Sequence, residues 1–389
     1  MYKKRDTFLP YAIPLIDEND INEVVDTLKS GWVAKGPKTM EFEKRFAAYV
    51  GAKHAIAMNS ATAALHIALI AAGIKPGDEV ITTSMTFAAT VNTIVHMGAI
   101  PVFVDIDPET GCIDADKIEE KITKKTKAIV PVHYTGHACD MDKIRTIAEK
   151  YNLFVSEDAA HAVETFYKGD LIGKKGDCAC FSFYATKNIC TGEGGMLTTN
   201  RDDIAEKARV MSLHGMSKAA WNRYGKSGSW RYDIEYPGFK YNMFDIQAAL
   251  AKTQMNKLNE MQNRRKEIVS AYNDAFSKVD GVKIPVVRSY TTHSWHLYVL
   301  RLELDKLTID RDRFIELMNE ANIGISVHFI PVHLMSYYRN NYGFKEGDLP
   351  LTEKYFDSIV SLPLYPKMTN DDVADVIGTV TYIISNNHK

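Results

Sequence analysis

The 389-residue sequence predicts an α/β protein whose main sheet is mostly parallel and covered by helices on both faces. Two observations lead to this fold class. Short apolar runs bounded by turn residues alternate with helical patterns through the first two-thirds of the chain, and this alternation is typical of parallel sheets. The length also exceeds what one ordinary core holds, so a second, smaller unit is expected.

The first predicted elements follow one another along the chain. Residues 17–30 have helical spacing, with one apolar stripe made of Ile21, Val24, Val25 and Leu28. An Ala- and Leu-rich helix is expected over 60–73, because Ser60 can cap its start and Gly73 can end it. Another helical pattern covers 140–151. The strands are expected at 79–83, 100–106, 127–134, 153–158, 178–184 and 194–199.

The last third of the chain is expected to form the smaller unit. A long helix is predicted from about Phe244 to Ser277. Beyond it, the pattern predicts a strand within 295–304 and helices at 311–322 and 370–386. We therefore predict a large domain over 1–250 and a smaller C-terminal α+β domain over 251–389.

Composition and charge exclude several classes of protein. The formal net charge of −2, without a long basic block, argues against a nucleic-acid partner. No apolar run approaches the ~20 residues of a membrane span, and the first residues lack the apolar segment of a signal peptide. Five scattered cysteines favour reduced thiols and a cytoplasmic protein. His133, His137 and Cys139 match no standard zinc spacing, so no metal is predicted.

Four features fall where ligands collect in open α/β sheets, at the carboxyl ends of strands. Asp158 ends one predicted strand, Lys187 follows another, and Phe87 follows a third. Residues 59–62 precede the Ala-rich helix, whose first N–H groups form a natural anion site. The sequence thus offers an amine, a carboxylate, an aromatic plate and a phosphate cradle.

Pyridoxal phosphate needs this set of groups. A lysine amine forms a Schiff base with its aldehyde, and a carboxylate keeps a proton on the pyridine nitrogen. Alone, Lys187 would be interpreted as a surface charge and Asp158 as a cap or turn residue. Their occurrence together, each just after a predicted strand, favours a cofactor site.

Five motifs resemble the DegT–StrS type of sugar aminotransferase, within the aspartate-aminotransferase fold class (PLP fold type I). They are NSATAAL (59–65), SMTFAATVN (84–92), EDAAHA (157–162), SFYATKNICTGEGG (182–195) and KYNMFDIQAAL (240–250). The motifs occur in the family's order, and the resemblance covers nearly the whole chain. It is strongest to the branch that aminates 4-keto sugars on UDP, which includes the aminoarabinose and spore-coat polysaccharide aminotransferases.

The resemblance implies roles around the cofactor ring. Lys187 is implied to be the Schiff-base lysine and proton shuttle, and Asp158 the partner of the pyridine nitrogen. Phe87 is implied to stack on the ring, and His161 to contact the ring hydroxyl.

The resemblance also implies how the cofactor phosphate is held. Ala61, Thr62 and Ser182 are implied to bind it from within one subunit. Asn242 is implied to reach the phosphate of the neighbouring subunit, so the expected working unit is a homodimer with shared active sites. Substrate contacts are expected from Tyr184, His328 and Lys35.

The implied reaction is transfer of an amino group from glutamate to the C4 keto carbon of a UDP-linked sugar, for a surface polysaccharide or glycan. Two alternatives remain open: amination at C3 of a dTDP-linked keto sugar, and a regulator that binds pyridoxal phosphate without turnover. Related dehydratases often replace the lysine with histidine, so the presence of Lys187 favours amino transfer.

Overall fold

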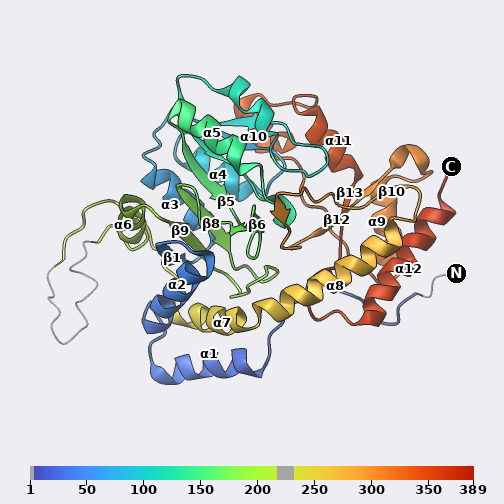
Figure 1. Ribbon diagram of the computed structural model, residues 1–389, viewed down its shortest axis with the longest axis horizontal. Helices are drawn as coiled ribbons and strands as arrows, with labels where there is room; N and C mark the ends of the chain where they lie inside the picture. Colours follow the sequence, from blue (N-terminus) through green and yellow to red (C-terminus); the bar gives the residue numbers. More distant parts are fainter. Residues whose placement is uncertain (1–3, 217–231) are drawn as a thin grey trace.

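A computed structural model describes residues 4–216 and 232–389 and confirms the α/β class (Figure 1). The strands of its main sheet are β1 (His54–Met58), β2 (Glu79–Thr83), β3 (Ile100–Val104), β4 (Thr126–Val130), β5 (Phe154–Asp158), β8 (Cys178–Ser182) and β9 (Gly195–Thr199). Their order across the sheet is β1-β9-β8-β5-β4-β2-β3. Neighbouring strands run parallel from β8 to β3, whereas β9 is antiparallel to both β1 and β8.

The six strands expected between residues 79 and 199 are all present, with ends that differ by a few residues. β1 was not predicted from the sequence. Its segment HAIAM is short and rich in alanine, so its pattern does not separate a strand from a helix.

Each central strand supplies alternate residues to two cores, one on each face of the sheet. In β8, Ala179 and Phe181 join the core that includes α2 (Pro37–Val50) and α5 (Met141–Tyr151). Cys178 and Cys180 join the opposite core, with α3 (Ala61–Ala71), α4 (Ala88–His96) and α6 (Asp202–Met211). Because helices cover both faces, all of β8 is buried, which explains its apolar and small residues.

The helix predicted from about Phe244 to Ser277 is two helices. They are α7 (Asp245–Asn256) and α8 (Leu258–Phe276), separated at Lys257, whose φ of −111° and ψ of 12° leave the helical region. The domain boundary predicted at residue 250 falls inside α7 and stays a prediction.

Beyond α8 the chain builds a second, antiparallel sheet with its own core (Figure 1). Its strands are β10 (Val282–Lys283), β12 (Tyr298–Leu302) and β13 (Ile359–Leu362), and the core also takes in α9 (Arg311–Glu320) and α12 (Asn370–Asn386). The helices α10 (Ser336–Tyr342) and α11 (Pro350–Ser358) precede β13. A small sheet joins β11 (Thr291–Thr292), β6 (Phe166–Tyr167) and β7 (Asp170–Leu171), which links this part to the main sheet's connections.

α1 (Glu18–Ser30) confirms the first predicted helix, but its apolar stripe faces outward. Ile21, Val25 and Leu28 are 45%, 38% and 53% exposed. The residues of this helix that are buried are instead polar, Asp20 and Thr27. An amphipathic helix normally buries its apolar stripe, so this face is left without a partner within the described chain.

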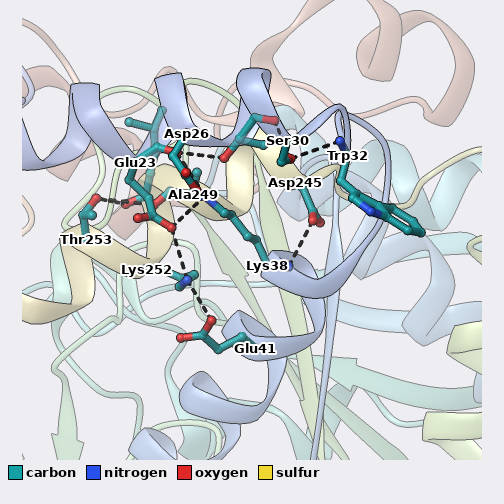
Figure 2. Close-up of polar contacts among 12 residues, drawn as sticks. Glu23, Asp26, Ser30, Trp32, Lys38, Glu41, Asp245, Ala249, Lys252 and Thr253 are labelled. Atoms are coloured by element: carbon teal, nitrogen blue, oxygen red, sulfur yellow. Dashed lines mark hydrogen bonds and ion pairs between the residues drawn. The ribbon is translucent and has the colours of Figure 1, made fainter.

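Polar contacts hold α1 against α7 (Figure 2). The Glu23 carboxylate lies 2.9 Å from Lys38 Nζ and 3.2 Å from Lys252 Nζ. Lys252 also pairs with Glu41 of α2 at 2.7 Å. Thr253 donates to the buried Asp20 carboxylate. These contacts fix which face of α1 points inward. None of the helices within 4–216 and 232–389 combines the length and apolar character needed to cross a membrane.

Candidate active site

A cavity of about 500 Å³ opens at the carboxyl ends of the parallel strands. Asp158 is the last residue of β5, Ser182 is the last residue of β8, and Phe87 follows β2 by four residues. The N-terminus of α3 supplies another wall. The cavity brings together nine of the residues predicted for the site: Ala61, Thr62, Phe87, Asp158, His161, Ser182, Tyr184, Lys187 and His328.

Lys187 points its amine into this cavity. The removal of water around the amine lowers the pKa of Lys187 from 10.5 to about 7, and the nearby Asp158 charge opposes that fall only in part. An amine with this pKa exists in both its neutral and charged forms near neutral pH. It can therefore act as a nucleophile and as a proton carrier, which an ordinary surface lysine cannot.

The chain around Lys187 is fixed by buried neighbours. Phe183 and Ile189 are fully buried in the core below the sheet end. The Asn188 side-chain amide donates to the Ser294 carbonyl at 3.1 Å, and the Lys187 N–H closes a turn onto the Tyr184 carbonyl at 2.9 Å. These contacts fix the backbone position from which the Lys187 side chain extends into the cavity.

Asp158 presents a buried carboxylate on the cavity wall, 4% exposed. The Thr90 hydroxyl donates to Oδ2 at 2.7 Å, and the Ala160 N–H donates to Oδ1 at 3.0 Å. Burial raises the pKa of Asp158, while these two donors and the Lys187 charge act in the opposite direction. Each oxygen keeps lone-pair capacity for a further donor, such as a protonated ring nitrogen.

The tautomer of His161 follows from a backbone contact. The Thr135 N–H donates to His161 Nδ1 at 3.2 Å, so Nδ1 is an acceptor and Nε2 carries the hydrogen. Burial, with a contribution from the Lys187 charge, lowers the pKa of His161 well below its usual value. His161 is therefore a neutral hydrogen-bond donor at the cavity wall.

The anion end of the cavity is built on the start of α3. Ser60 caps this helix, and its hydroxyl accepts the Ala63 N–H at 3.1 Å. The N–H groups of Ala61 and Thr62 have no acceptor within the helix and can bind an anion. Gly195 of β9 lies directly behind this turn, where a Cβ atom would approach the Ser60 carbonyl to 2.3 Å. Gly195 thus permits the close approach that shapes the cradle.

Two predicted site residues lie outside the cavity of their own chain. Lys35 Nζ is 3.1 Å from the Glu43 carboxylate, and both side chains are largely buried. Asn242 lies beside β1, where it forms a bridge with Met58, and its Oδ1 is buried without a hydrogen-bond partner in the described chain.

Several residues that line the cavity were not predicted from the sequence. Thr90 lies inside the SMTFAATVN motif, but nothing in the pattern distinguishes it from a helix residue. Tyr11, His296 and Phe329 come from segments far along the chain from Lys187, and no periodicity marks them. Only the packing of the N-terminal segment, which carries Tyr11, and of the C-terminal part against the sheet brings them to the cavity.

The groups collected here are those that pyridoxal phosphate requires, and comparison with known proteins gives the family. Residues 14–381 match the profile of the DegT/DnrJ/EryC1/StrS aminotransferase family. The chain belongs to this family. The sequence-based prediction of the family is therefore confirmed.

Relatives of this aminotransferase share its full length. It is 56% identical over 385 residues to the spore coat polysaccharide biosynthesis protein SpsC of Bacillus subtilis (strain 168), covering 99% of both chains. It is 42% identical over 384 residues to the UDP-4-amino-4-deoxy-L-arabinose–oxoglutarate aminotransferase of Shewanella sediminis, covering 97% of this chain and 99% of the other.

Solved structures of relatives agree in fold and cofactor. The Streptococcus pneumoniae protein Spr1654 in its PLP form is 35% identical, with a TM-score of 0.91 over 97% of this chain and 99% of that one. The same protein in its PMP form gives a TM-score of 0.92. The protein described here is thus a pyridoxal-phosphate-dependent sugar aminotransferase with the PLP type I fold.

The lowered pKa of Lys187 predicts an unusual pH dependence of stability for this aminotransferase without its cofactor. Folded Lys187 loses its proton near pH 7, whereas the unfolded chain keeps it until about 10.5. Between these values the unfolded state binds more protons, so this group makes the fold more stable as the pH rises. The Lys187→Met variant removes the effect and is expected to be more stable by roughly 4 kcal/mol at pH 7 and roughly 2 kcal/mol at pH 9.

Urea unfolding of the two cofactor-free proteins at both pH values measures this difference. Equal stability of Lys187→Met and the unsubstituted protein at pH 7 and pH 9 would contradict the lowered pKa.

Proposed function

We propose that this aminotransferase moves an amino group from glutamate to the C4 keto carbon of a UDP-linked sugar, in the biosynthesis of a surface polysaccharide or glycan. Similarity to two relatives over nearly their whole length supports this choice, since one of them is named for a UDP-linked 4-amino sugar and oxoglutarate. The observation that carries the chemistry is a lysine amine with a pKa of about 7 in one cavity with a buried carboxylate.

Three side chains act around the reacting centre in this proposal. Bound pyridoxal phosphate supplies a ring that takes up the electron pair released beside its aldehyde carbon. The Asp158 carboxylate would accept the ring N–H and so keep that nitrogen protonated. The Lys187 amine would move a proton between Cα of the amino donor and carbon C4′ of the cofactor, which its pKa suits at neutral pH. His161, whose Nδ1 accepts the Thr135 N–H, has its Nε2–H available for the ring hydroxyl oxygen.

The remaining predicted residues are proposed to hold the cofactor phosphate and ring and to contact the sugar substrate. The α3 N-terminus and the Ser182 hydroxyl at the end of β8 would bind the phosphate, and Phe87 would cover a face of the ring. Phe87 and Tyr184 are 63% and 47% exposed at the cavity, so their rings are free to contact a ligand. The residues assigned to these tasks are Ala61, Thr62, Phe87 and Ser182 for the cofactor, and Tyr184 and His328 for the sugar. Lys35, also predicted to contact the sugar, pairs with Glu43 outside this cavity.

A panel of keto nucleotide sugars tests the substrate assignment. With glutamate as donor, we expect mass spectrometry to detect exchange of the keto oxygen for an amine on a UDP-4-keto-6-deoxyhexosamine or a UDP-4-keto pentose. Amination of a dTDP-3-keto sugar alone would replace the proposal by its C3 alternative. If the protein binds the cofactor but aminates none of the sugars, the non-catalytic regulator is the better interpretation.

We also propose that two copies form a dimer with shared active sites. The outward stripe of α1 continues into the exposed Trp32 and Val33, 53% and 45% exposed. Among the described residues that line the cavity, Lys187 is the only lysine or arginine, although a phosphate and the carboxylates of glutamate must bind there. A second copy would cover the apolar stripe and supply polar groups, with Asn242 at the neighbour's phosphate.

Two valines with matched exposure test this dimer. Val25 of α1 is 38% exposed, and Val287, in the segment before β11, is 40% exposed. Light scattering is expected to give two chains for the unsubstituted protein and for Val287→Asp, but a large monomer fraction for Val25→Asp, because a buried unpaired charge costs several kcal/mol. A Val25→Asp protein that stays dimeric at low concentration would exclude this face as the interface.

A further inference from the structure

His296 lies beside the amine of Lys187 and has no role in the function proposed above. Its Nε2 atom is 3.4 Å from Lys187 Nζ, at the long end of hydrogen-bonding distances, and the residue is 6% exposed. Its other ring nitrogen, Nδ1, is buried and has no hydrogen-bond partner in the described chain. The imidazole therefore directs its one recorded hydrogen bond at the reactive amine.

The position of His296 is fixed by contacts on both sides. The Leu297 N–H donates to the Thr135 carbonyl at 3.2 Å, just before the chain enters β12. The Ser294 hydroxyl donates to the His161 carbonyl at 2.8 Å, and the Ser294 carbonyl accepts the Asn188 amide. A neighbour of His296, Ser294, is thus hydrogen-bonded to Asn188, the residue next to Lys187. This contact helps to fix the His296 and Lys187 side chains beside each other.

His296 is suited to accept rather than to carry charge. Burial lowers the pKa of His296 well below its usual value, and the nearby charges of Lys187, His161, Arg265 and His328 act in the same direction. A neutral imidazole has one unprotonated nitrogen that can accept from an ammonium group. Asp158 also faces Lys187. Its oxygens already accept hydrogen bonds from the Thr90 hydroxyl and the Ala160 N–H, and their remaining lone pairs can accept from a ring nitrogen.

We propose that His296 is a positioning residue for the catalytic lysine, whose Nε2 accepts a hydrogen bond from the Lys187 ammonium whenever that amine is not bonded to the cofactor. The lysine would be released from the cofactor in the first half of the reaction, carry a proton in both halves and bond to the cofactor again at the end of the second. His296 gives the charged amine a fixed partner during that interval. The catalytic role of Lys187 in this inference rests on the proposed function, whereas the hydrogen bond itself rests on the distance between Lys187 and His296.

The test measures Lys187 in the cofactor-free, full-length protein. The rate at which acetic anhydride labels Lys187, followed by peptide mass spectrometry across pH, reports the pKa of that amine. The midpoint is expected near 7 without substitution and lower by about 1 in His296→Leu, because the acceptor that stabilises the ammonium is gone. His296→Gln retains an acceptor and is expected to restore most of the shift.

His293→Gln is the matched control. His293 is equally buried three residues earlier in the chain, where it bonds to Thr135 and Trp295 and does not line the cavity. This variant is expected to change stability but not the labelling midpoint. A folded His296→Leu protein with an unchanged midpoint would overturn the proposal.

A second measurement needs no substitution. In ¹⁵N-histidine spectra of the cofactor-free protein below pH 7, His296 is expected as the tautomer with hydrogen on Nδ1; hydrogen on Nε2 would also overturn the proposal. Neither readout involves the cofactor or a sugar. Failure of the unsubstituted enzyme to aminate any keto sugar would therefore count against the proposed function alone.

Discussion

Lys187→Ala is expected to abolish glutamate-driven amination of the keto sugar, by ~10⁴-fold or more, while the protein stays folded. The alanine removes both the amine that bonds to the cofactor and the base that moves the proton. No other lysine or arginine among the described cavity residues can replace it. Steady-state turnover with a UDP-4-keto sugar, together with circular dichroism, measures the two halves of this prediction.

Lys306→Ala is the control for this variant. Lys306 is 38% exposed and pairs with Asp280 and Glu303 at the surface of the C-terminal part, so its loss should leave turnover and fold intact. Substantial amination by the Lys187→Ala protein would remove Lys187 from the mechanism.

Asp158→Asn is expected to lower kcat by roughly 10²–10³-fold and to weaken retention of the cofactor. The amide has nearly the shape of the carboxylate, and it can keep the Thr90 contact. It has no negative charge to hold a proton on the ring nitrogen, so the ring becomes a poorer electron acceptor. Cofactor dissociation followed by absorbance, and single-turnover rates with glutamate, measure the two effects.

Thr90→Val separates the effect of the Asp158 charge from the effect of the hydrogen bond that positions its carboxylate. This variant keeps the Asp158 charge but removes a hydroxyl that donates to it at 2.7 Å. Its expected loss is roughly 10-fold, the size of one hydrogen bond to a charged group. Asp158→Asn kinetics that match the unsubstituted enzyme would reject the ring-nitrogen role.

The sequence was sufficient to predict the α/β class and to predict that Asp158 and Lys187 meet at one edge of the sheet, for a physical reason. Parallel strands end at one edge of the sheet, so residues that follow different strands meet there. Asp158 and Lys187 are 29 positions apart in the sequence, and this rule alone places them in one cavity, where the structure has them. The helix start at Ala61 could be predicted likewise, since Ser60 is a strong N-cap.

Features that depend on long-range packing could not be predicted. The helical spacing of α1 reveals an apolar stripe, but the direction of that stripe is set by polar contacts with α7, more than 200 residues away. The interruption at Lys257 has no glycine or proline to mark it. His296 reaches Lys187 only because the turn before β12 bonds to the segments around Thr135 and Asn188.

The most direct test of this account is to locate the bond between the enzyme and its cofactor. The protein loaded with pyridoxal phosphate is reduced with borohydride, digested and mapped by mass spectrometry, so that the modified lysine is read from its peptide. The account predicts the phosphopyridoxyl label on Lys187, and loss of that label when glutamate is added before reduction. A label on any other lysine, or a Lys187 label that glutamate leaves unchanged, would contradict it.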